Sequence, residues 1–437
     1  MNDIKALREN ANGERERLLS RGVSPGEIDE LLELDSDARA RIAERDEIRG
    51  RINSLSKEVS EAMRSGDKVR ADALRNESRA LGQALDVMQS RVVQAEEARL
   101  ARVLLIPNVP SVDAPVGASE DENVVLRYWS PEHGVQDPDE YVAPVADDAK
   151  KAHWEIGESM RLLDLPRAAR ISGSMFAMYR GDGARLLRAL TSFALDAHSD
   201  AFEEIRPPTL VKSDTMIATG HLPKFADDAY ELPRDDLYAI PTAEVPLTSF
   251  ARDEILDEAE LPLRLTAATA CYRREAGSAG RDTRGLLRLH EFDKVELFAY
   301  CAEAQAPEVH LDMLRRAEGI LRALGITYRV VDLCTGDMGA SAARTFDLEA
   351  YAPGVGKWLE VSSVSWCGDY QARRANIRYR ASDGSGNRFV HTLNGSALAW
   401  ARVWAIIVEM GYREEGAVEV PQVLVPYLGG RTTLSSS

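Results

Sequence analysis

The feature that most constrains this chain is a hydrophobic repeat in residues 31–95. Mostly apolar or small side chains recur there at alternating steps of three and four residues, in two runs separated by Ser65-Gly66-Asp67. The two runs are Leu31, Leu34, Ala38, Arg41, Arg45, Ile48, Ile52, Leu55, Val59 and Ala62, and then Leu74, Ser78, Leu81, Leu85, Met88, Val92 and Ala95. Such a repeat is typical of coiled-coil helices, and so short a turn makes the two helices antiparallel neighbours. The sequence therefore predicts a helical hairpin whose arms, of about 30 residues each, reach roughly 45 Å at 1.5 Å per residue.

The charge of the chain is distributed unevenly. The full sequence has a formal net charge of −17, yet residues 39–102 contain 14 Lys and Arg against 11 Asp and Glu, which leaves +3 there and −20 elsewhere. We therefore expect a polyanion to prefer the N-terminal third. Arg41 and Arg45 lie on the apolar seam of the hairpin. They either pack their aliphatic stems with the charged ends in water, or contact the phosphates of a nucleic acid.

A break in composition ends the hairpin near residue 106. Ile106-Pro107-Asn108-Val109-Pro110 and Pro115-Val116-Gly117 stop any helix. We expect an arm at 1–106, a linker at 107–120 and a second domain at 121–437. That domain is predicted to mix strands at 238–247, 263–272, 295–300, 328–333 and 358–363 with helices at 184–200, 307–324 and 396–410. Interleaved strands and helices over this length predict one large α+β domain.

Several classes of protein are excluded by what the sequence lacks. No apolar run approaches the roughly 20 residues that a membrane span requires, and the first residues contain no apolar signal-peptide core. We therefore expect a cytoplasmic protein without a membrane partner. The four cysteines, at 271, 301, 334 and 367, form no CxxC pair. A disulfide framework or a zinc site is not expected.

The richest chemistry lies in residues 271–296, which read CYRREAGSAGRDTRGLLRLHEFDKVE. Arg273 and Glu275 end a predicted strand and, being two residues apart, point to the same face. A glycine-rich loop adds Arg281, Arg284 and Arg288 before the next strand begins near Phe292. Guanidinium groups suit phosphate oxygens, and an aromatic ring can stack on a base. With no GxxxxGK[ST] or GxGxxG present, the pattern predicts a nucleotide site built on arginines.

Six segments in order resemble the bacterial-type seryl-tRNA synthetases, which are class II aminoacyl-tRNA synthetases. Arg273-Arg274-Glu275, the loop EAGSAGRDTRGL and Phe292 resemble the family's motif 2. The other matching segments are GHLPKF at 220–225, which follows a motif 1 region with its proline at Pro208, Thr242-Ala243-Glu244 for a serine-binding element, Glu360-Val361-Ser362-Ser363 for an ATP and metal segment, HTLNGS through Arg402 for motif 3, and the hairpin for the tRNA-binding arm. The resemblance covers essentially the whole chain.

This resemblance implies a catalytic domain built on an antiparallel sheet flanked by helices, and a two-step ATP-dependent reaction. Serine attacks the α-phosphate of ATP to form seryl-adenylate, and the seryl group then passes to tRNA. Arg273 and Arg402 are implied as catalytic residues. The implied ATP-binding residues are Arg273, Arg274, Glu275, Arg288, Phe292, Glu360, Val361, Ser362, Ser363 and Arg402. Mg²⁺ is implied at Glu360 and Ser363, since it prefers oxygen ligands.

The resemblance also implies the partners of the chain. The implied serine-binding residues are Thr242, Ala243, Glu244, Arg273, Glu296 and Ser396. Further implications are a homodimer, L-serine as substrate, and recognition of tRNA(Ser), and also of tRNA(Sec), by the shape of the RNA rather than by its anticodon. Arg41 and Arg45 are the candidate tRNA contacts on the arm.

The chain departs from the family pattern at a few positions near the expected site. Val364 and Trp366 stand where the family usually has cysteine and asparagine, and Met175 stands where arginine is common. We expect either neutral repacking, or a variant paralogue whose altered serine pocket tolerates a seryl-like inhibitor. Two other functions stay open: an amino-acid-activating ligase that loads a carrier protein, and a non-catalytic relative. The long hairpin argues against the first, and the retained arginines and carboxylates argue against the second.

Overall fold

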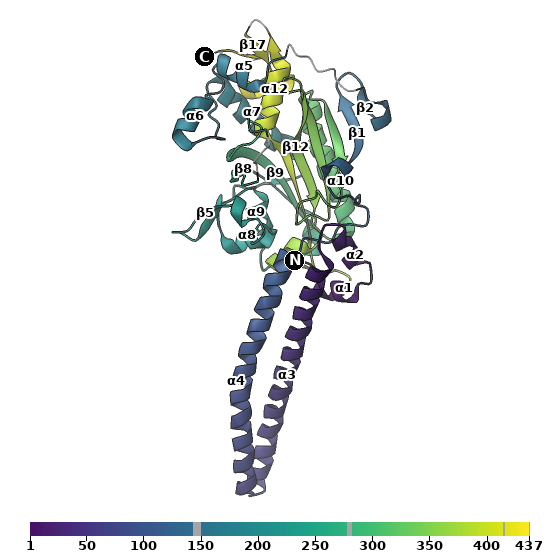
Figure 1. Cartoon of the computed structure of the whole chain (residues 1–437), viewed down its shortest axis with the longest axis vertical. Helices are drawn as coiled ribbons and strands as arrows, with labels where there is room; N and C mark the ends of the chain where they lie inside the picture. The colour runs from purple at the N-terminus through teal and green to yellow at the C-terminus, as the bar shows by residue number, and fades with distance from the viewer. Residues whose placement is uncertain (143–149, 278–281, 414–415, 437) are drawn as a thin grey trace. The chain divides into compact units, whose positions relative to one another are not determined.

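The computed structural model describes the chain apart from residues 143–149, 278–281, 414–415 and 437 (Figure 1). The described residues form two compact units. The helical arm is Asn2–Pro107, and the sheet unit is Met1 together with Asn108–Ser437.

The helical arm is a hairpin of two long helices with two short helices before it. The elements are α1 (Ile4–Glu9), α2 (Glu14–Leu19), α3 (Pro25–Arg64) and α4 (Lys68–Leu105). Ser24 begins α3 with a capping box to Glu27, and Asp67 caps α4 by accepting from the Arg70 N–H at 3.0 Å. The helices therefore begin and end where the sequence places its caps and the Ser65-Gly66-Asp67 turn.

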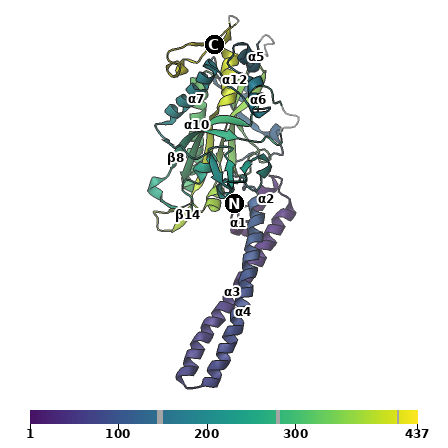
Figure 2. The same ribbon diagram turned by 90° about the vertical axis from the view of Figure 1, so that its left-hand side faces the viewer.

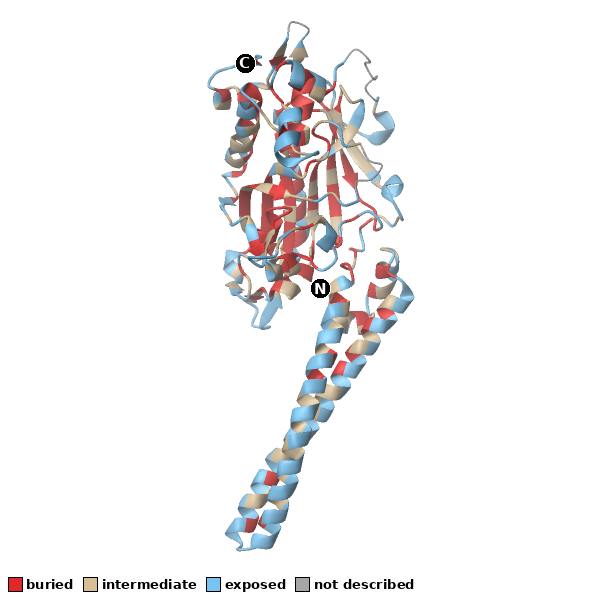
Figure 3. Ribbon diagram, turned by 60° about the vertical axis from the view of Figure 1, so that its left-hand side comes forward, coloured by how far each residue is buried: buried red, intermediate tan, exposed pale blue. Residues whose placement is uncertain are grey.

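The predicted seam of the hairpin is confirmed. Every residue of the two predicted runs is buried or half-buried, and buried positions recur along both helices in Figure 3. Ion pairs across the hairpin join Arg102 to Glu30 at 2.9 Å and Arg51 to Glu77 at 2.8 Å. Residues late in α4 thus face residues early in α3, as an antiparallel pair requires.

The sheet unit is built on nine strands of the described residues, which confirms the predicted α+β fold. Their order is β2 (Gly134–Gln136), β1 (Val124–Ser130), β10 (Tyr328–Asp332), β11 (Arg344–Ala352), β12 (Lys357–Trp366), β15 (His391–Ala399), β9 (Glu291–Cys301), β8 (Leu263–Tyr272) and β3 (Glu203–Glu204). Neighbouring strands are antiparallel except for β3 beside β8.

Helices and small sheets complete this unit. The helices are α5 (His153–Ser159), α6 (Leu165–Ser172), α7 (Asp182–His198), α8 (Ser213–Thr219), α9 (Glu244–Thr248), α10 (Ala306–Ala323), α11 (Tyr370–Ala375) and α12 (Trp400–Gly411). The small sheets are β14 (Asn387–Phe389), β13 (Arg378–Arg380) and β7 (Ile255–Asp257); β16 (Tyr412–Arg413), β17 (Ala417–Glu419) and β18 (Thr433–Leu434); and β4 (Leu210–Lys212), β6 (Leu237–Ala239) and β5 (Tyr230–Leu232).

The two faces of the large sheet bury different partners. The main core joins one face to α7, α10 and α12, which are labelled in Figure 2, and a second core joins the other face to α9 and α11. Strand β9 shows the alternation, because Val295, Leu297 and Ala299 enter the main core while Phe298 and Tyr300 enter the second. Both faces of the central strands are therefore packed against other elements of this unit.

Two predicted elements were wrong in extent. Residues 238–247 were expected as a strand, yet β6 ends at Ala239 and Glu244–Thr248 forms α9. Pro241 and Pro246 cannot donate to a sheet ladder, and they disfavour a strand there. The last helix was expected from 396, but Ser396 continues β15 opposite Glu296 of β9 and the helix begins at Trp400. Pairing between distant strands decided this segment over its local helical pattern.

No helix among the described residues combines the length and the hydropathy needed to cross a membrane.

Candidate active site

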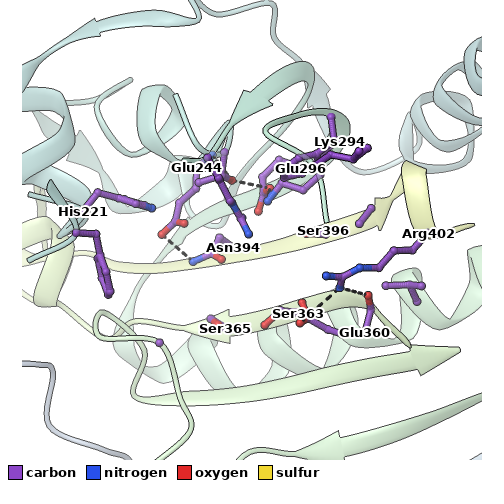
Figure 4. A pocket seen from close by; sticks show the side chains of 18 of the residues that line it. His221, Glu244, Lys294, Glu296, Glu360, Ser363, Ser365, Asn394, Ser396 and Arg402 are labelled. Carbon is purple, nitrogen blue, oxygen red and sulfur yellow. Dashed lines mark hydrogen bonds and ion pairs between the residues drawn. The ribbon is translucent and has the colours of Figure 1, made fainter. Parts of the chain in front are cut away.

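A pocket of about 420 Å³ opens on the large sheet, and most of the predicted site residues line it (Figure 4). Those residues are Thr242, Glu244, Arg273, Glu275, Arg288, Phe292, Glu296, Glu360, Val361, Ser363, Ser396 and Arg402. They come from the start of α9, from β9, β12 and β15, from the first turn of α12 and from the chain on either side of β8 and β9. Segments far apart in the sequence thus meet at one cavity.

Strand pairing explains why these side chains meet. Alternate residues of β9, namely Phe292, Lys294 and Glu296, line the pocket, while the residues between them turn to the other face. Ser396 of β15 lies opposite Glu296, and Ser365 of β12 lies opposite Asn394 of β15. Directly opposed residues share a face, so three adjacent strands present their polar side chains to the same space.

One end of the pocket is walled by carboxylates. Glu296 accepts a hydrogen bond from the Thr242 hydroxyl at 3.0 Å and forms an ion pair with Lys294. Glu244 accepts from the amide of Gln371 at 2.6 Å and from that of Asn394 at 3.1 Å, the second of which is drawn in Figure 4. Both acids are buried; the side chains that donate to Glu244 are neutral amides, while the nearby charges of Lys294 and Arg273 act to lower its pKa. This end can bind a small ligand that carries a cation and a hydroxyl.

The titration of this end differs from that of free side chains. Burial and the nearby charge of Glu296 raise the pKa of Glu244 to about 7, against the opposing hydrogen bond from Gln371. Burial, together with the charges of Arg273, Lys294 and Arg374, lowers the pKa of His221 to about 3. The His221 imidazole is therefore neutral near pH 7, and its Nδ1 lies 2.9 Å from the Thr219 hydroxyl.

The other end of the pocket gathers arginines. The Arg273 guanidinium lies 5.2 Å from the centre of the Phe292 ring, and its Nε donates to the Pro241 carbonyl at 3.4 Å. Arg402 donates from Nη1 to the backbone carbonyl of Glu360 at 2.5 Å. Arg288 donates to Glu275 at 3.0 Å. Guanidinium groups around an aromatic ring suit a nucleotide with its phosphates.

The oxygen donors beside Arg402 fit a hard cation. Glu360 and Ser363 line the pocket, and Asp347 lies directly opposite Ser363 in the sheet. Asp347 Oδ1 is buried without a hydrogen-bond partner among the described residues, and burial and the charge of Glu360 raise the pKa of this side chain. No cluster of three His, Cys, Asp or Glu side chains suited to a metal occurs in the described part of the chain. This donor set fits Mg²⁺, which commonly takes few protein ligands and completes its shell with phosphate oxygens and water.

The remaining predicted site residues lie elsewhere. Arg274 is exposed and follows Arg273, so its side chain leaves the pocket side of the chain. Ser362 turns to the main-core side of β12 and donates to the Ser396 carbonyl at 2.6 Å. Ala243 is buried in the second core. Alternation along β12 accounts for the orientation of Ser362. Arg281 lies outside the described residues.

The pocket contains residues that were not predicted as site residues. Lys294, Asn394, Ser365 and His221 all line it. Lys294 and Asn394 each stand two residues before a predicted site residue on the same strand, so a period of two would have identified them. His221 lies in the GHLPKF segment after the predicted motif 1 region, and no periodic signal identifies it.

The departures from the family pattern do not reach the pocket. Trp366 lies opposite Leu393 and Val364 opposite Gly395, on the main-core side of β12 and β15. Trp366 donates from its indole N–H to His391 Nδ1 at 3.2 Å. Met175 does not line the pocket, and its carbonyl accepts from the His290 N–H at 2.9 Å. Val364 and Trp366 stay off the pocket because adjacent positions in a strand face opposite sides, and the expectation of a variant serine pocket stays a prediction.

The two candidate arginines of the arm pair with acids of the same helix. Arg41 binds Asp37 and Arg45 binds Asp46, both at 2.8 Å. The Arg45 side chain is 18% exposed and that of Arg41 34%. Both stems pack on the seam while the guanidinium groups reach its rim.

Comparisons with known proteins agree in both units. Residues 1–110 match a family model described as the seryl-tRNA synthetase N-terminal domain, and residues 228–411 match one described as the tRNA synthetase class II core domain (G, H, P, S and T). The chain is 46% identical to a serine–tRNA ligase of Gemmatimonas aurantiaca, over 98% of this chain and 99% of that protein. It is 43% identical to one of Staphylococcus haemolyticus, over 99% of each.

Solved structures show the same likeness. A seryl-tRNA synthetase from Pyrococcus horikoshii, complexed with ATP, matches with a TM-score of 0.91 at 35% identity over 100% of each chain. A cytoplasmic serine–tRNA ligase from Naegleria fowleri in complex with AMP matches with a TM-score of 0.85 at 28% identity, over 100% of this chain and 99% of that one.

Proposed function

Since the chain belongs to the seryl-tRNA synthetase family of class II aminoacyl-tRNA synthetases, we propose that it activates L-serine with ATP and transfers the seryl group to tRNA(Ser). The observation that carries this proposal is the pocket itself. Arg273 and Arg402 face the same cavity as Glu244 and Glu296. A triphosphate and a small amino acid can therefore bind side by side.

The first step requires placement rather than a protein nucleophile. The serine carboxylate is already ionised at neutral pH and attacks the α-phosphorus of ATP, releasing pyrophosphate. In-line positioning and relief of negative charge lower the barrier of such a step. We assign Arg273 to the α-phosphate and Arg402 to the γ-phosphate. The Glu275 carboxylate is assigned to the adenine amino group and Phe292 to stacking on the adenine ring.

Glu360 and Ser363 would hold Mg²⁺, which when bound would neutralise phosphate charge. The chain itself orients this region, since Arg402 fixes the backbone of Glu360. Val361 lines the same wall.

Recognition of serine would come from the carboxylate end. Glu244 faces the ammonium group, and Thr242, Glu296 and Ser396 offer partners to the hydroxyl. A site whose buried polar groups need a substrate hydroxyl rejects alanine, because those groups would otherwise stay unpaired.

The second step would transfer the seryl group to the 2′- or 3′-hydroxyl of the terminal tRNA adenosine. We propose that the helical arm recognises the shape of tRNA(Ser), and of tRNA(Sec) with a similar shape, and that Arg41 and Arg45 contact phosphates. A homodimer formed through the region of Pro208 and a cytoplasmic location complete the proposal.

Amino-acid-dependent pyrophosphate exchange tests the first step. We expect exchange with serine, and at least about a hundredfold less with alanine, threonine or glycine, because each lacks or misplaces the hydroxyl. Exchange with another amino acid in preference to serine would overturn the substrate.

A charging assay separates transfer to tRNA from transfer to a carrier protein. The long hairpin of α3 and α4 favours tRNA over a carrier protein as the acceptor. We expect labelled serine on tRNA(Ser) and none on a carrier protein. The reverse result would establish the carrier-loading alternative, and no exchange with any amino acid would indicate a non-catalytic relative.

A further inference from the structure

A buried pair of side chains lies outside the pocket and links two helices to the loop that follows β8. His153 begins α5 and Glu409 belongs to α12, and both side chains are 0% exposed. His153 Nδ1 lies 2.7 Å from Glu409 Oε1. The carboxylate also accepts the backbone N–H of His153 at 3.0 Å and that of Gly354 at 2.8 Å. Glu409 is thus a fully hydrogen-bonded buried group.

The second ring nitrogen of His153 faces the loop. Nε2 accepts a hydrogen bond from the backbone N–H of Leu286 at 3.0 Å. Since an N–H can only donate, Nε2 carries no proton, and the ring hydrogen is on Nδ1, where it points to Glu409. The neutral imidazole therefore has a fixed direction, with the carboxylate behind it and the loop backbone in front.

The loop is shaped for this approach. Gly285 has φ +59°, and a Cβ at this position would lie 2.4 Å from His153 Nε2 and 2.6 Å from the Trp154 ring. Only glycine lets the backbone come so close. Arg284 also stacks over Trp154, with its guanidinium 5.0 Å from the ring centre. The start of α5 therefore forms the surface against which residues 284–286 pack.

The next residues of the loop contact or supply the groups assigned to ATP. The carbonyl of Leu287 accepts from Arg402 Nε at 3.3 Å, and Arg402 shares α12 with Glu409. Arg288, next along the loop, lines the pocket. The loop therefore has two connections to α12: one through His153, whose partner Glu409 belongs to α12, and one directly to Arg402.

We propose that His153, held by Glu409, is a positioning residue that fixes loop residues 285–288 against α12 and so places Arg288 and Arg402 for the triphosphate of ATP. The inference rests on the proposed function, since it assigns a new residue to the same nucleotide site. His153 does not line the pocket, and it acts through the loop backbone.

Two substitutions separate this role from simple folding. In His153→Asn the amide nitrogen can replace Nδ1 as donor to Glu409, but the side chain is too short to accept from Leu286. In His153→Gln the longer side chain can bring its carbonyl oxygen to the position of Nε2. We expect H153N to raise both the KM and the Kd for ATP about tenfold and to change the KM for serine by less than about twofold, the loss of one buried hydrogen bond. We expect H153Q to recover most of the ATP affinity.

His310 supplies the matched control. It is buried on α10, 2.9 Å from the Val364 carbonyl, and does not line the pocket. His310→Asn should lower the melting temperature without changing the KM for ATP. The inference is overturned if H153N leaves ATP affinity unchanged, if H153Q weakens it as much as H153N does, or if the KM for serine rises equally.

ATP binding measured by calorimetry without amino acid separates this inference from the proposed function. Weaker ATP binding in H153N supports the positioning role whichever amino acid is activated. Normal ATP binding in H153N, with serine-dependent exchange intact in the unmodified chain, overturns the role and leaves the function standing.

Discussion

The helical arm and the sheet unit each bury a carboxylate, and they surround it in opposite ways. In the arm, Asp35 is 4% exposed and pairs with Arg8 at 2.8 Å, Arg39 at 2.9 Å and Arg99 at 3.4 Å. Burial acts to raise its pKa, but the hydrogen bonds from Arg39 and Arg8 outweigh it, so the pKa is lowered. In the sheet unit, burial and the charge of Glu296 instead raise the pKa of Glu244 to about 7.

This difference separates a carboxylate that stabilises the fold, Asp35, from one placed to bind a ligand, Glu244. A buried acid with cationic partners is complete, and removing it harms stability. A buried acid that lies beside another acid and accepts hydrogen bonds from neutral amides has a raised pKa, which is typical of functional sites. The predictions below test how the two units differ, beginning with the largest effect.

The largest effect is expected from adjacent arginines of the sheet unit. Arg273→Ala should lower kcat/KM for serine-dependent pyrophosphate exchange by about 10²–10³, since it removes a positioned cation from the reacting phosphate. Arg274→Ala is the matched control and should change it by less than about threefold, because Arg274 is exposed and outside the pocket. Equal losses in the two variants would mean that the pocket is wrongly identified.

The next effect separates the two units. Deleting residues 51–64 and 68–81, two heptads from each helix, while keeping the turn at 65–67 shortens the hairpin and leaves its base intact. Exchange should stay within about twofold, while kcat/KM for charging tRNA(Ser) should fall on the order of a hundredfold, because the variant keeps Arg41 and Arg45 but loses the outer part of the arm with its Lys and Arg side chains. A parallel fall in both activities would show that the arm serves the chemistry of activation as well.

A smaller effect is expected at Asp35. Asp35→Asn should destabilise the arm by about 3 kcal/mol, because three arginines lose their anion. Since the folded pKa is lowered, the stabilisation is present above the ordinary pKa near 4 and is lost as the pH falls through the folded value. Amide hydrogen exchange at the base of α3 and α4 measures it.

The control for this substitution is Asp37→Asn. Asp37 pairs with Arg41, yet its side chain is 47% exposed, so its loss should be within about 0.5 kcal/mol. Equal protection in the two variants would contradict a structural role for the arginines around Asp35.

The smallest effect has the opposite sign. The raised pKa of Glu244 means that the folded chain keeps a proton that the unfolded chain loses, so stability falls as the pH rises from the ordinary pKa near 4.3 to about 7. Glu244→Gln avoids this loss, so between pH 5 and pH 8 the variant should gain on the order of 2 kcal/mol in free energy of unfolding relative to the unmodified chain. Thermal melting at the two pH values measures it. A destabilised variant at pH 8 would place Glu244 with Asp35, as a group that holds the fold.

The two units also differ in how much the sequence predicted. The seam from Leu31 to Ala95 was predicted residue by residue, because a heptad repeat and a tight turn are local signals. In the sheet unit the motifs located the pocket, since they marked the strands that meet there. They did not distinguish Ser363 from Ser362 or Arg273 from Arg274, because pairing decides which side of a strand is the pocket side.

What the sequence could not predict depends on contacts between distant residues. Ser396 was assigned to a helix, yet its pairing with Glu296 keeps it in a strand. His153 and Glu409 are separated by 256 positions, and no periodic pattern relates them. Such contacts are visible only once the sheet has brought the segments together.

Proton release on serine binding tests the central claim most directly, namely that Glu244 pairs with the ammonium group of serine. With a pKa of about 7, Glu244 is about half protonated at pH 7 in the free chain, and the serine ammonium should drive that proton off. Calorimetry in buffers of different ionisation enthalpy should show release of about half a proton at pH 7 and almost none at pH 8.5. A binding enthalpy independent of the buffer at pH 7 would contradict the account.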